Sequence, residues 1–410
     1  MIKTCIIGAG AAGLLAAHSA LLRGEDTLIL EKNEKAGKKI YITGKGRCNV
    51  TNACDSDIFM KNIVRGGRFM YSALSSFGPS DLTKLLSDNH LRTKIERGNR
   101  VFPVTDHASD VTKALLSDVL SKGCAVKYNE EVTGIEKEGG SFRIRTGSES
   151  GRRSYKADKV IVCTGGLSYP STGSTGDGYR FAQDFGHKVT EPVPSLCQIN
   201  TVEDTSALAG ISLINTGLRA VRENGKNVFS DTGELLFTHS GISGPMALTV
   251  SSLYARELYA GEKMRLIIDL KPGLTEDMLS KRILRDFSEN ENAYIINALS
   301  KLLIKGIREE VIRRSGIAPE KKVNGITRAE RELLVKIIKG LSFTANGTGG
   351  FNEAVITCGG VSLKEIDPRT MESKLVPGLY FAGEVLDVDA FTGGFNLQIA
   401  FSTGFCAGRS

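Results

Sequence analysis

The stretch TCIIGAGAAG, residues 4–13, decides the fold, because it fits the pattern G-x-G-x-x-G at the junction of a predicted strand and a predicted helix. An apolar strand over residues 4–8 leads into the glycines, and the alanine-rich helix that follows ends near Gly24. A second apolar strand occupies residues 27–30. Strand, helix and strand in this order predict a parallel strand pair at the start of a Rossmann-type α/β domain.

Each glycine of this turn has a separate task when the turn holds a dinucleotide. Gly8 permits the tight turn, Gly10 lets the backbone approach a pyrophosphate, and Gly13 packs the helix on the strand. The N-terminus of the helix then faces the phosphates. Glu31 ends the second strand, where its carboxylate would accept hydrogen bonds from ribose hydroxyls and repel a 2′-phosphate. The turn therefore predicts bound FAD or NAD rather than NADP.

The pattern of elements changes several times along the chain. Short strands separated by polar turns predict a meander over residues 124–166, and helical periodicity begins after Pro272. The last seventy residues become strand-like and glycine-rich again, which indicates that the C-terminus completes the first domain. The predicted domains are a discontinuous FAD-binding domain (1–191 and 344–410), an inserted β-rich domain (192–271) and a helical bundle within the insertion (272–343).

Composition is that of a soluble enzyme, with 41% hydrophobic and 24% charged residues, too apolar and too balanced for a disordered chain. No run approaches the roughly 20 apolar residues that cross a bilayer, and no signal peptide precedes the first strand. The eight cysteines include no C-x-x-C pair, which favours free thiols in a reducing compartment. We expect a cytoplasmic protein without a membrane partner and leave its oligomeric state open.

The net charge of +7 is concentrated in residues 301–340, which hold eleven Lys or Arg against five Asp or Glu. These cations lie on predicted helices over residues 304–314 and 328–339, without interleaved aromatic residues. A solvated helix surface explains them better than an RNA or membrane patch. No nucleic-acid partner is expected from this segment, and a small-molecule substrate is favoured.

The loop of residues 37–52, GKKIYITGKGRCNVTN, is glycine-rich, cationic and amide-bearing. Such a loop can wrap phosphates and ribityl hydroxyls. Lys39 and Arg47 would offer positive charge, and Asn49 and Asn52 would orient hydrogen bonds. The loop strengthens the prediction of a bound dinucleotide.

Motifs spread over the whole chain resemble those of the bacterial flavoprotein family that includes aminoacetone oxidases and the flavin-dependent reductase of dehydro-bile acids. Besides the loop of residues 37–52, they are RVFPV (100–104), TGGLSYPSTGSTGDGY (164–179), LLFTHSGISGP (235–245) and the segment from GGVSLKEID to QIAFSTG (359–404). The resemblance implies a two-dinucleotide-binding-domain flavin fold with an inserted β-barrel-like unit and helical bundle. It also implies non-covalent FAD.

The resemblance assigns roles position by position. The residues expected to hold the ADP half of FAD are Gly8, Gly10, Ala12, Gly13, Glu31, Lys32 and Lys39. Those expected nearer the flavin are Thr43, Gly44, Arg47, Cys48 and Asn49. Val132, Thr164 and Gly165 complete the predicted cofactor-binding set of the N-terminal part.

The C-terminal motifs supply the other side of the predicted cofactor site. LYFAGE, residues 379–384, resembles the second FAD motif, in which Gly383 and Glu384 contact the ribityl and pyrophosphate region. Gly394, Asn396 and Leu397 then open the last helix, whose N–H groups and dipole could stabilise negative charge at the N1–C2=O edge of the reduced flavin.

Three side chains are candidates for catalysis. Cys48 lies in the flavin loop but has no neighbouring cysteine for a redox disulfide, so loop packing is its other interpretation. His239 is the best-placed histidine for proton transfer, although it could equally cap backbone groups. Tyr169 could donate a proton or pack as an aromatic side chain. No metal signature is present, and no metal is predicted.

These observations favour an FAD-dependent oxidoreductase that exchanges hydride between flavin and a small organic molecule. Only one complete G-x-G-x-x-G is present, so NADH, as a transient electron donor, would use the same flavin. We favour an NADH-dependent reductase of conjugated enones of steroid or bile-acid type. The alternatives are an oxygen-using amine oxidase, a tRNA-modifying flavoprotein and a non-catalytic FAD-binding protein.

Overall fold

The computed structural model describes residues 2–148 and 151–410, and the chain divides into two compact units. The first unit contains Met1–Ser195 and Gly350–Ser410. The second, called here the barrel unit, contains Leu196–Gly349. This division lies a few residues from the boundaries predicted at 191/192 and 343/344.

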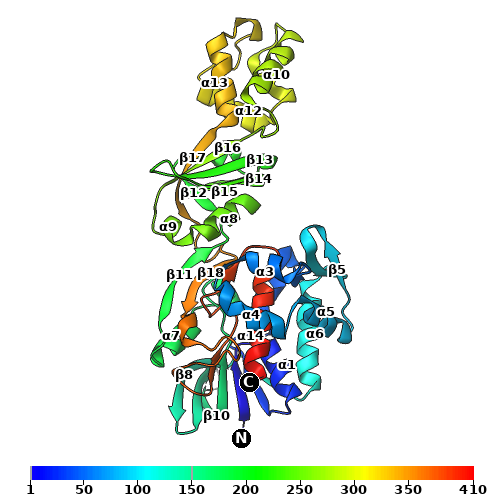
Figure 1. Cartoon of the computed structure of the whole chain (residues 1–410), viewed down its shortest axis with the longest axis vertical. Coiled ribbons are helices and arrows are strands. Elements are labelled where there is room, and N and C mark those ends of the chain that lie inside the picture. The colour runs from blue at the N-terminus through cyan, green and yellow to red at the C-terminus, as the bar shows by residue number, and fades with distance from the viewer. Residues whose placement is uncertain (1, 149–150) are drawn as a thin grey trace. The chain divides into compact units, whose positions relative to one another are not determined.

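A parallel sheet forms the centre of the first unit (Figure 1). β1 pairs in parallel with β2 on one side and β10 on the other, so that Cys5 lies between Leu28 and Val160. Every residue of β2 is buried, as expected for a parallel strand covered on both faces. The sheet order is β7-β2-β1-β10-β9-β8, with β19 also on β10: β1 Ile2–Ile7, β2 Thr27–Leu30, β7 Ala125–Lys127, β8 Glu131–Glu138, β9 Ser141–Ser148, β10 Gly151–Val162, β19 Leu379–Phe381.

The long strand β10 joins two kinds of sheet. Its first half pairs antiparallel with β9, which pairs antiparallel with β8, and this is the predicted meander. Its second half pairs in parallel with β1 and β19. Pairing with β19 places a C-terminal strand beside the N-terminal strands, so both ends of the chain build one Rossmann-type sheet.

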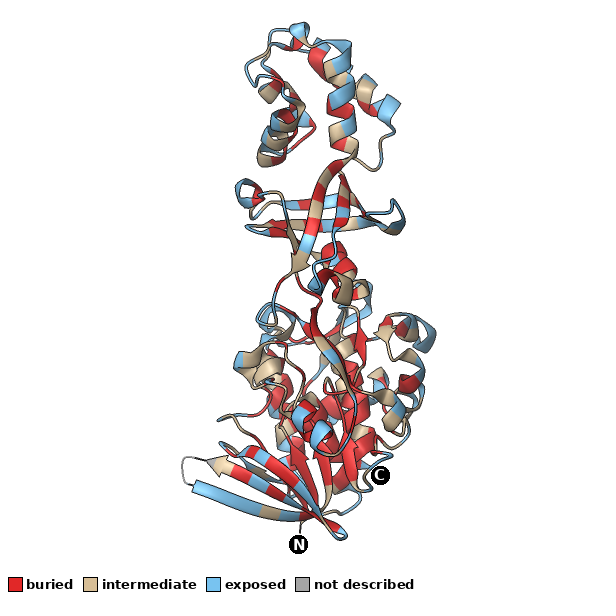
Figure 2. Cartoon of the chain, turned by 90° about the vertical axis from the view of Figure 1, so that its left-hand side faces the viewer, coloured by how far each residue is buried: buried red, intermediate tan, exposed pale blue. Residues whose placement is uncertain are grey.

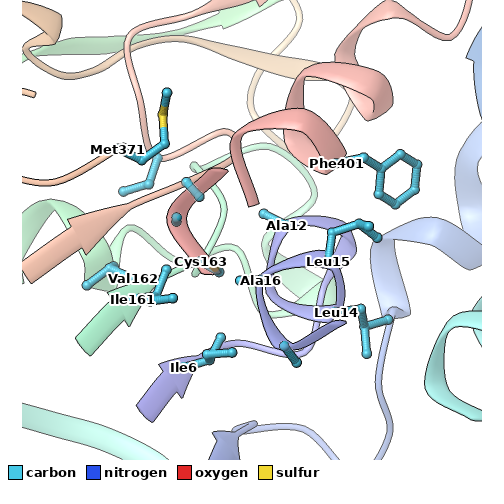
Figure 3. Close-up of a cluster of buried hydrophobic side chains, with 14 of the residues drawn as sticks. Ile6, Ala12, Leu14, Leu15, Ala16, Ile161, Val162, Cys163, Met371 and Phe401 are labelled. Atoms are coloured by element: carbon cyan, nitrogen blue, oxygen red, sulfur yellow. The ribbon is translucent and has the colours of Figure 1, made fainter. Parts of the chain in front are cut away.

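Helices α1 (Ala11–Leu22) and α14 (Phe395–Gly408) pack closely against each other. A Cβ at Gly404 would lie 2.2 Å from the carbonyl oxygen of Ala12, and a Cβ at Gly408 2.1 Å from that of Ala16. Only glycine allows this approach. The buried side chains around α1, β1, β10 and α14 form the core of the unit (Figures 2 and 3).

Smaller elements surround this core. They pair as β3-β6-β5, β20-β4 and β11-β18. The strand bounds are β3 Thr51–Asn52, β4 Ile63–Arg65, β5 Thr93–Glu96, β6 Arg100–Pro103, β11 Val189–Ser195, β18 Ile356–Val361 and β20 Asp389–Ala390. The helix bounds are α2 Lys38–Ile42, α3 Ser56–Lys61, α4 Gly67–Ser76, α5 Pro79–Asp88, α6 Ala108–Ser121 and α7 Asp177–Asp184.

The barrel unit contains a closed barrel in the order β12-β15-β14-β13-β16-β17. Its core includes the rings of Phe237 and Phe343, whose centroids are 5.5 Å apart. The strand bounds are β12 Ile199–Thr201, β13 Ser212–Arg222, β14 Asn227–Thr238, β15 Gly241–Ser243, β16 Met264–Asp269 and β17 Leu341–Thr348. β17 pairs with both β16 and β12, so residues 344–348, expected in the first domain, complete the barrel instead.

Helices interrupt and extend the barrel. α8 (Pro245–Leu253) and α9 (Ala255–Tyr259) lie in a segment for which mostly strands and loops were expected. The predicted helical segment contains α10 (Glu276–Ser288), α11 (Ile295–Ala298), α12 (Lys305–Ser315) and α13 (Arg328–Lys339). Within the described residues, no helix is long and apolar enough to cross a membrane, and no group of three or more His, Cys, Asp or Glu could hold a metal ion.

Candidate active site

The glycine turn between β1 and α1 is closely packed at two positions and open at the third. A Cβ at Gly8 would lie 2.6 Å from the carbonyl oxygen of Cys163, and a Cβ at Gly13 1.9 Å from that of Gly8. A Cβ at Gly10 would meet nothing within 4 Å. Gly10 is also the N-cap of α1 and offers no side chain to the first N–H groups of the helix. The open position and the uncapped helix end suit an incoming pyrophosphate.

Glu31 is 6% exposed and is fixed beside this turn. Its Oε2 accepts a hydrogen bond from the N–H of Ala9 (2.7 Å), and its Oε1 accepts two from Asn33 (2.8 and 2.7 Å). Each carboxylate oxygen has a further lone pair for a ribose hydroxyl. Lys32 instead pairs with Asp177 (2.7 Å), so its charge is already neutralised within the protein.

The two cations predicted to face phosphates are held in ion pairs. Lys39 Nζ lies 2.5 Å from Glu384 Oε2 and also donates to the hydroxyl of Ser168. Arg47 pairs with Glu96 and Asp106, which raises the pKa of its guanidinium, and its side chain stacks on the ring of Phe102. Arg47 therefore braces the loop of residues 37–52 against β5 and β6.

The chemistry of Cys48 is limited by burial. Its side chain is fully buried, with backbone φ of 58°, and burial raises the pKa of the thiol to about 12 despite a hydrogen bond from Thr43. A thiol with this pKa is protonated at neutral pH and is a poor nucleophile. Thr43 itself donates to the carbonyl of Ile40, and Gly44 takes the left-handed conformation that continues the loop.

Residues from the two ends of the chain are brought together here. A Cβ at Gly394 would lie 2.9 Å from Asn49 Oδ1, and a Cβ at Gly383 2.9 Å from the methyl of Ala12. The N–H of Gly383 donates to Thr403 in α14. The N-terminal loop and the C-terminal motifs predicted to share one cofactor are therefore neighbours.

The start of α14 is a helix N-terminus held open by its neighbours. Gly394 is the N-cap, with φ of 96° and no side-chain cap. Asn396 fixes the preceding loop, because its Oδ1 accepts from the N–H of Ala390 and its Nδ2 donates to the carbonyl of Ala390. Leu397 is half-buried in the first turn. The first-turn N–H groups of this 14-residue helix can stabilise negative charge placed before them.

Thr164, Gly165 and Val132 lie around the ends of the sheet strands. Thr164 and Gly165 directly follow β10, and Gly165 has φ of 74°. Val132 is buried in β8, two residues beyond Glu130, whose N–H donates to the carbonyl of Glu31. These positions place all three near the glycine turn or near Glu31.

Two buried polar atoms in this region have no hydrogen-bond partner among the described residues. They are Asn49 Oδ1, beside the start of α14, and Thr164 Oγ1, just after β10. Buried polar atoms are otherwise paired with few exceptions. Together with the open face at Gly10, they show that these residues fit a bound dinucleotide.

Sequence reasoning missed several residues that shape the site. Glu384 Oε1 accepts hydrogen bonds from Ser168 and from the N–H of Thr357. Burial raises the pKa of Tyr179 well above its usual value, and the charge of Glu384 adds to that effect. Thr357 lies in a buried strand and Tyr179 on a short helix, so both match core patterns. Only their position beside Glu384 distinguishes them.

The catalytic candidates are divided between the two units. Tyr169 is half-buried in the first unit, with φ of 52° and its N–H donating to the carbonyl of Phe351. Cys48 belongs to the same unit. His239 is exposed at the turn between β14 and β15 of the barrel unit.

A Rossmann-type sheet, a glycine turn with an acidic strand end, and a second nucleotide motif from the C-terminus define an FAD-dependent oxidoreductase. A family model described as the HI0933-like protein Rossmann domain matches residues 2–410. The chain belongs to this family.

Two curated relatives match over nearly their whole length. The chain is 32% identical to a 3-dehydro-bile acid delta(4,6)-reductase of Clostridium scindens, with 100% of this chain and 99% of the relative covered. It is 31% identical to a ribosomal RNA dihydrouridine synthase of Haemophilus influenzae, with 100% and 98% covered.

Solved structures share the fold at low sequence identity. A flavocytochrome c3 fumarate reductase has a TM-score of 0.52 and 15% identity, covering 100% of this chain and 77% of that one. A 3-ketosteroid delta1-dehydrogenase from Sterolibacterium denitrificans has a TM-score of 0.51 and 13% identity, covering 99% and 98%. These similarities support the flavoprotein fold.

Proposed function

We propose that this protein reduces a carbon–carbon double bond conjugated with a carbonyl group, using electrons delivered by NADH through FAD. The two curated relatives differ in the substrates that their names give, a dehydro-bile acid and ribosomal RNA. The double bonds are chemically alike, because a 3-oxo-Δ4,6 steroid and the uracil ring both carry an alkene conjugated with a carbonyl. Hydride addition at the β-carbon and protonation at the α-carbon saturate either one.

The N-terminus of α14 carries this proposal. When bound, FAD supplies the hydride that the alkene accepts. Gly394 has no side chain to occupy the first-turn N–H groups, and Asn396 holds the preceding loop in place. These N–H groups would stabilise negative charge on the pyrimidine end of the reduced ring, which favours taking hydride from a donor.

The environment of Cys48 supports hydride transfer over thiol chemistry. Its thiol stays protonated because burial raises its pKa to about 12. Among the described residues, the neighbouring Cys54 is also a free thiol. Tyr169 remains our candidate for protonating the α-carbon, and His239 remains a candidate for a substrate contact from the barrel unit.

Anaerobic spectroscopy tests the electron donor and acceptor in turn. Addition of NADH to the purified FAD-loaded protein should bleach the flavin absorbance. Subsequent addition of a conjugated steroid enone, or of an RNA containing uridine, should restore it without oxygen. Restoration by neither, combined with bleaching by a primary amine such as aminoacetone, would replace this proposal with an amine oxidase.

Tyr169→Phe separates proton donation from packing. The variant keeps the ring and should bleach with NADH at the wild-type rate while the alkene-dependent reoxidation slows by about 10²-fold. Equal reoxidation rates would remove Tyr169 from the reaction.

A further inference from the structure

The hairpin formed by β5 and β6 carries three exposed arginines without acidic partners. Arg92 precedes β5, and Arg97 and Arg100 flank the turn. None of the three forms an ion pair with a described residue, and Arg100 Nε donates only to the carbonyl of Arg97. The acids nearby are already paired, because Arg47 and Lys94 neutralise Glu96 and Asp106. The hairpin therefore presents a net cationic surface.

A second cationic surface lies between α3 and α4. A groove of 320 Å³ there is lined by Lys61, Arg68 and Tyr71, together with Asp57 and Met60. Tyr71 is 61% exposed, and the side chains of Lys61 and Arg68 are exposed and form no ion pair among the described residues. An exposed aromatic ring between two cations is the arrangement on which a nucleic-acid base stacks while its phosphates are neutralised.

Hydrogen bonds connect both surfaces to the loop that opens α14. Asn52 Nδ2 donates to the carbonyl of Gly98 at the hairpin turn and to the carbonyl of Gly393, at 3.0 Å each. On the other side, the N–H of Phe391 donates to the carbonyl of Asn62, which directly follows α3. β20 of the same loop pairs with β4. The groove and the hairpin thus flank the loop that leads to the proposed flavin end of the site.

We propose that these two surfaces form one RNA-binding face, consisting of Lys61, Arg68, Tyr71, Arg92, Arg97 and Arg100. It holds a single-stranded RNA on either side of the uracil that is reduced. The proposal rests on the function proposed above and selects RNA as the substrate class. Arginines bind the phosphates through charge and paired N–H donors, and Tyr71 stacks on a flanking base. α3 and β5 lie at the same end of the first unit (Figure 1).

The lysines and arginines of residues 301–340 are a poorer RNA surface than their number suggests. Most of them are neutralised by nearby carboxylates. The pairs are Lys301–Glu289, Arg313–Glu310, Arg314–Glu310, Lys321–Glu330, Arg328–Glu332 and Lys339–Asp269. The charge excess that the sequence locates on α12 and α13 is therefore largely internal to that helical segment.

Fluorescence anisotropy of a fluorescein-labelled oligouridylate of about 20 nucleotides tests the face in the FAD-loaded protein. Arg97→Gln/Arg100→Gln should weaken binding about fivefold or more and lower the slope of log Kd against log salt by about one. Tyr71→Ala should weaken binding about fivefold or more through lost stacking. The matched control is Arg152→Gln/Lys156→Gln, which removes two exposed cations from the far end of the unit (Figure 1).

The control variant should bind like the wild type, and so should Lys321→Gln/Lys322→Gln. Equal losses in the hairpin and control variants, or no RNA binding by the wild type, would overturn the RNA-binding face. Anisotropy does not require flavin turnover, so reduction of cyclohex-2-enone in the same preparations reports the proposed function separately. Enone reduction without RNA binding rejects only the face, whereas RNA binding without reduction of enone or RNA uracil rejects the function.

Discussion

Lys39 and Glu384, 345 positions apart in the sequence, form a half-buried ion pair with Nζ 2.5 Å from Oε2. The pair joins the loop after the first strand pair to the nucleotide motif at the C-terminus. Glu384 accepts two further hydrogen bonds, from Ser168 and Thr357, so four separate segments of the first unit converge on one carboxylate.

Glu384→Gln should therefore lower both stability and FAD content. The amide leaves the ammonium of Lys39 without a counter-charge, at a cost of about 1–3 kcal/mol in the free energy of unfolding of the apoprotein. Urea denaturation and the ratio of flavin to protein measure the two effects. In contrast, Asp158→Asn breaks the exposed pair with Lys3 and should cost no more than about 1 kcal/mol. Equal, small losses would show that the Lys39–Glu384 pair does not organise the site.

Gly10 and Gly13 should respond differently to alanine. Gly10→Ala leaves the apoprotein as stable as the wild type, because its methyl meets no protein atom, but weakens FAD binding about tenfold or more by intruding on the pyrophosphate. Gly13→Ala forces a methyl against the Gly8 carbonyl and costs about 3 kcal/mol in stability. Flavin fluorescence titration and urea denaturation separate the two. Unchanged FAD affinity in Gly10→Ala would contradict the placement of the phosphates.

Cys48 should be inert at neutral pH. With a pKa raised to about 12, its thiol stays protonated up to mildly alkaline pH, so alkylation of the native protein by iodoacetamide should not reach it. Cys48→Ala should keep turnover within about threefold. Peptide mapping by mass spectrometry checks the labelling, with the urea-unfolded protein as the positive control. Selective labelling of native Cys48, or a hundredfold loss of turnover, would restore a redox role.

Asp118 should make stability depend on acid pH. Burial works to raise the pKa of this carboxyl, but hydrogen bonds from His18 and Lys122 outweigh it and lower the pKa from 3.8 to about 2. A lowered acid pKa stabilises the fold above the unfolded value, and that contribution is lost as pH falls from 3.8 to about 2. Asp118→Asn should therefore reduce stability at pH 5 and flatten this acid limb.

The control for Asp118 is Asp88→Asn on the exposed pair with Lys84, which should leave the acid limb as in the wild type. Denaturation curves between about pH 2 and 6 make the comparison. An unchanged acid limb in Asp118→Asn would mean that other carboxyls control it.

Local patterns in the sequence predicted the Rossmann sheet and its ligand. The glycine turn and Glu31 lie within one strand–helix–strand unit, so their geometry follows from neighbouring residues. β17 could not be assigned in the same way, because its apolar alternation is the same whether it pairs with β16 of the barrel or with the first domain. That choice depends on strands more than seventy residues away.

Pairings across the chain account for what the sequence left open in the site. Lys39 was predicted to face phosphate, and nothing near it in the sequence indicates that Glu384 neutralises it. The same holds for Asn52, which was expected to orient hydrogen bonds and bridges Gly98 to Gly393. The excess charge on α12 and α13 was correctly located, but its neutralisation depends partly on carboxylates of other elements such as Glu289 and Asp269.

Product analysis after one anaerobic turnover tests most directly whether this protein saturates a conjugated double bond. The FAD-loaded protein, reduced by NADH and freed of excess donor, is mixed with a steroid enone or with uridine-containing RNA, and the products are weighed by mass spectrometry. We predict a product heavier than the substrate by two hydrogen atoms, formed in a quantity that matches the flavin reoxidised. Recovery of unchanged substrates while the flavin stays reduced would contradict the proposed reaction.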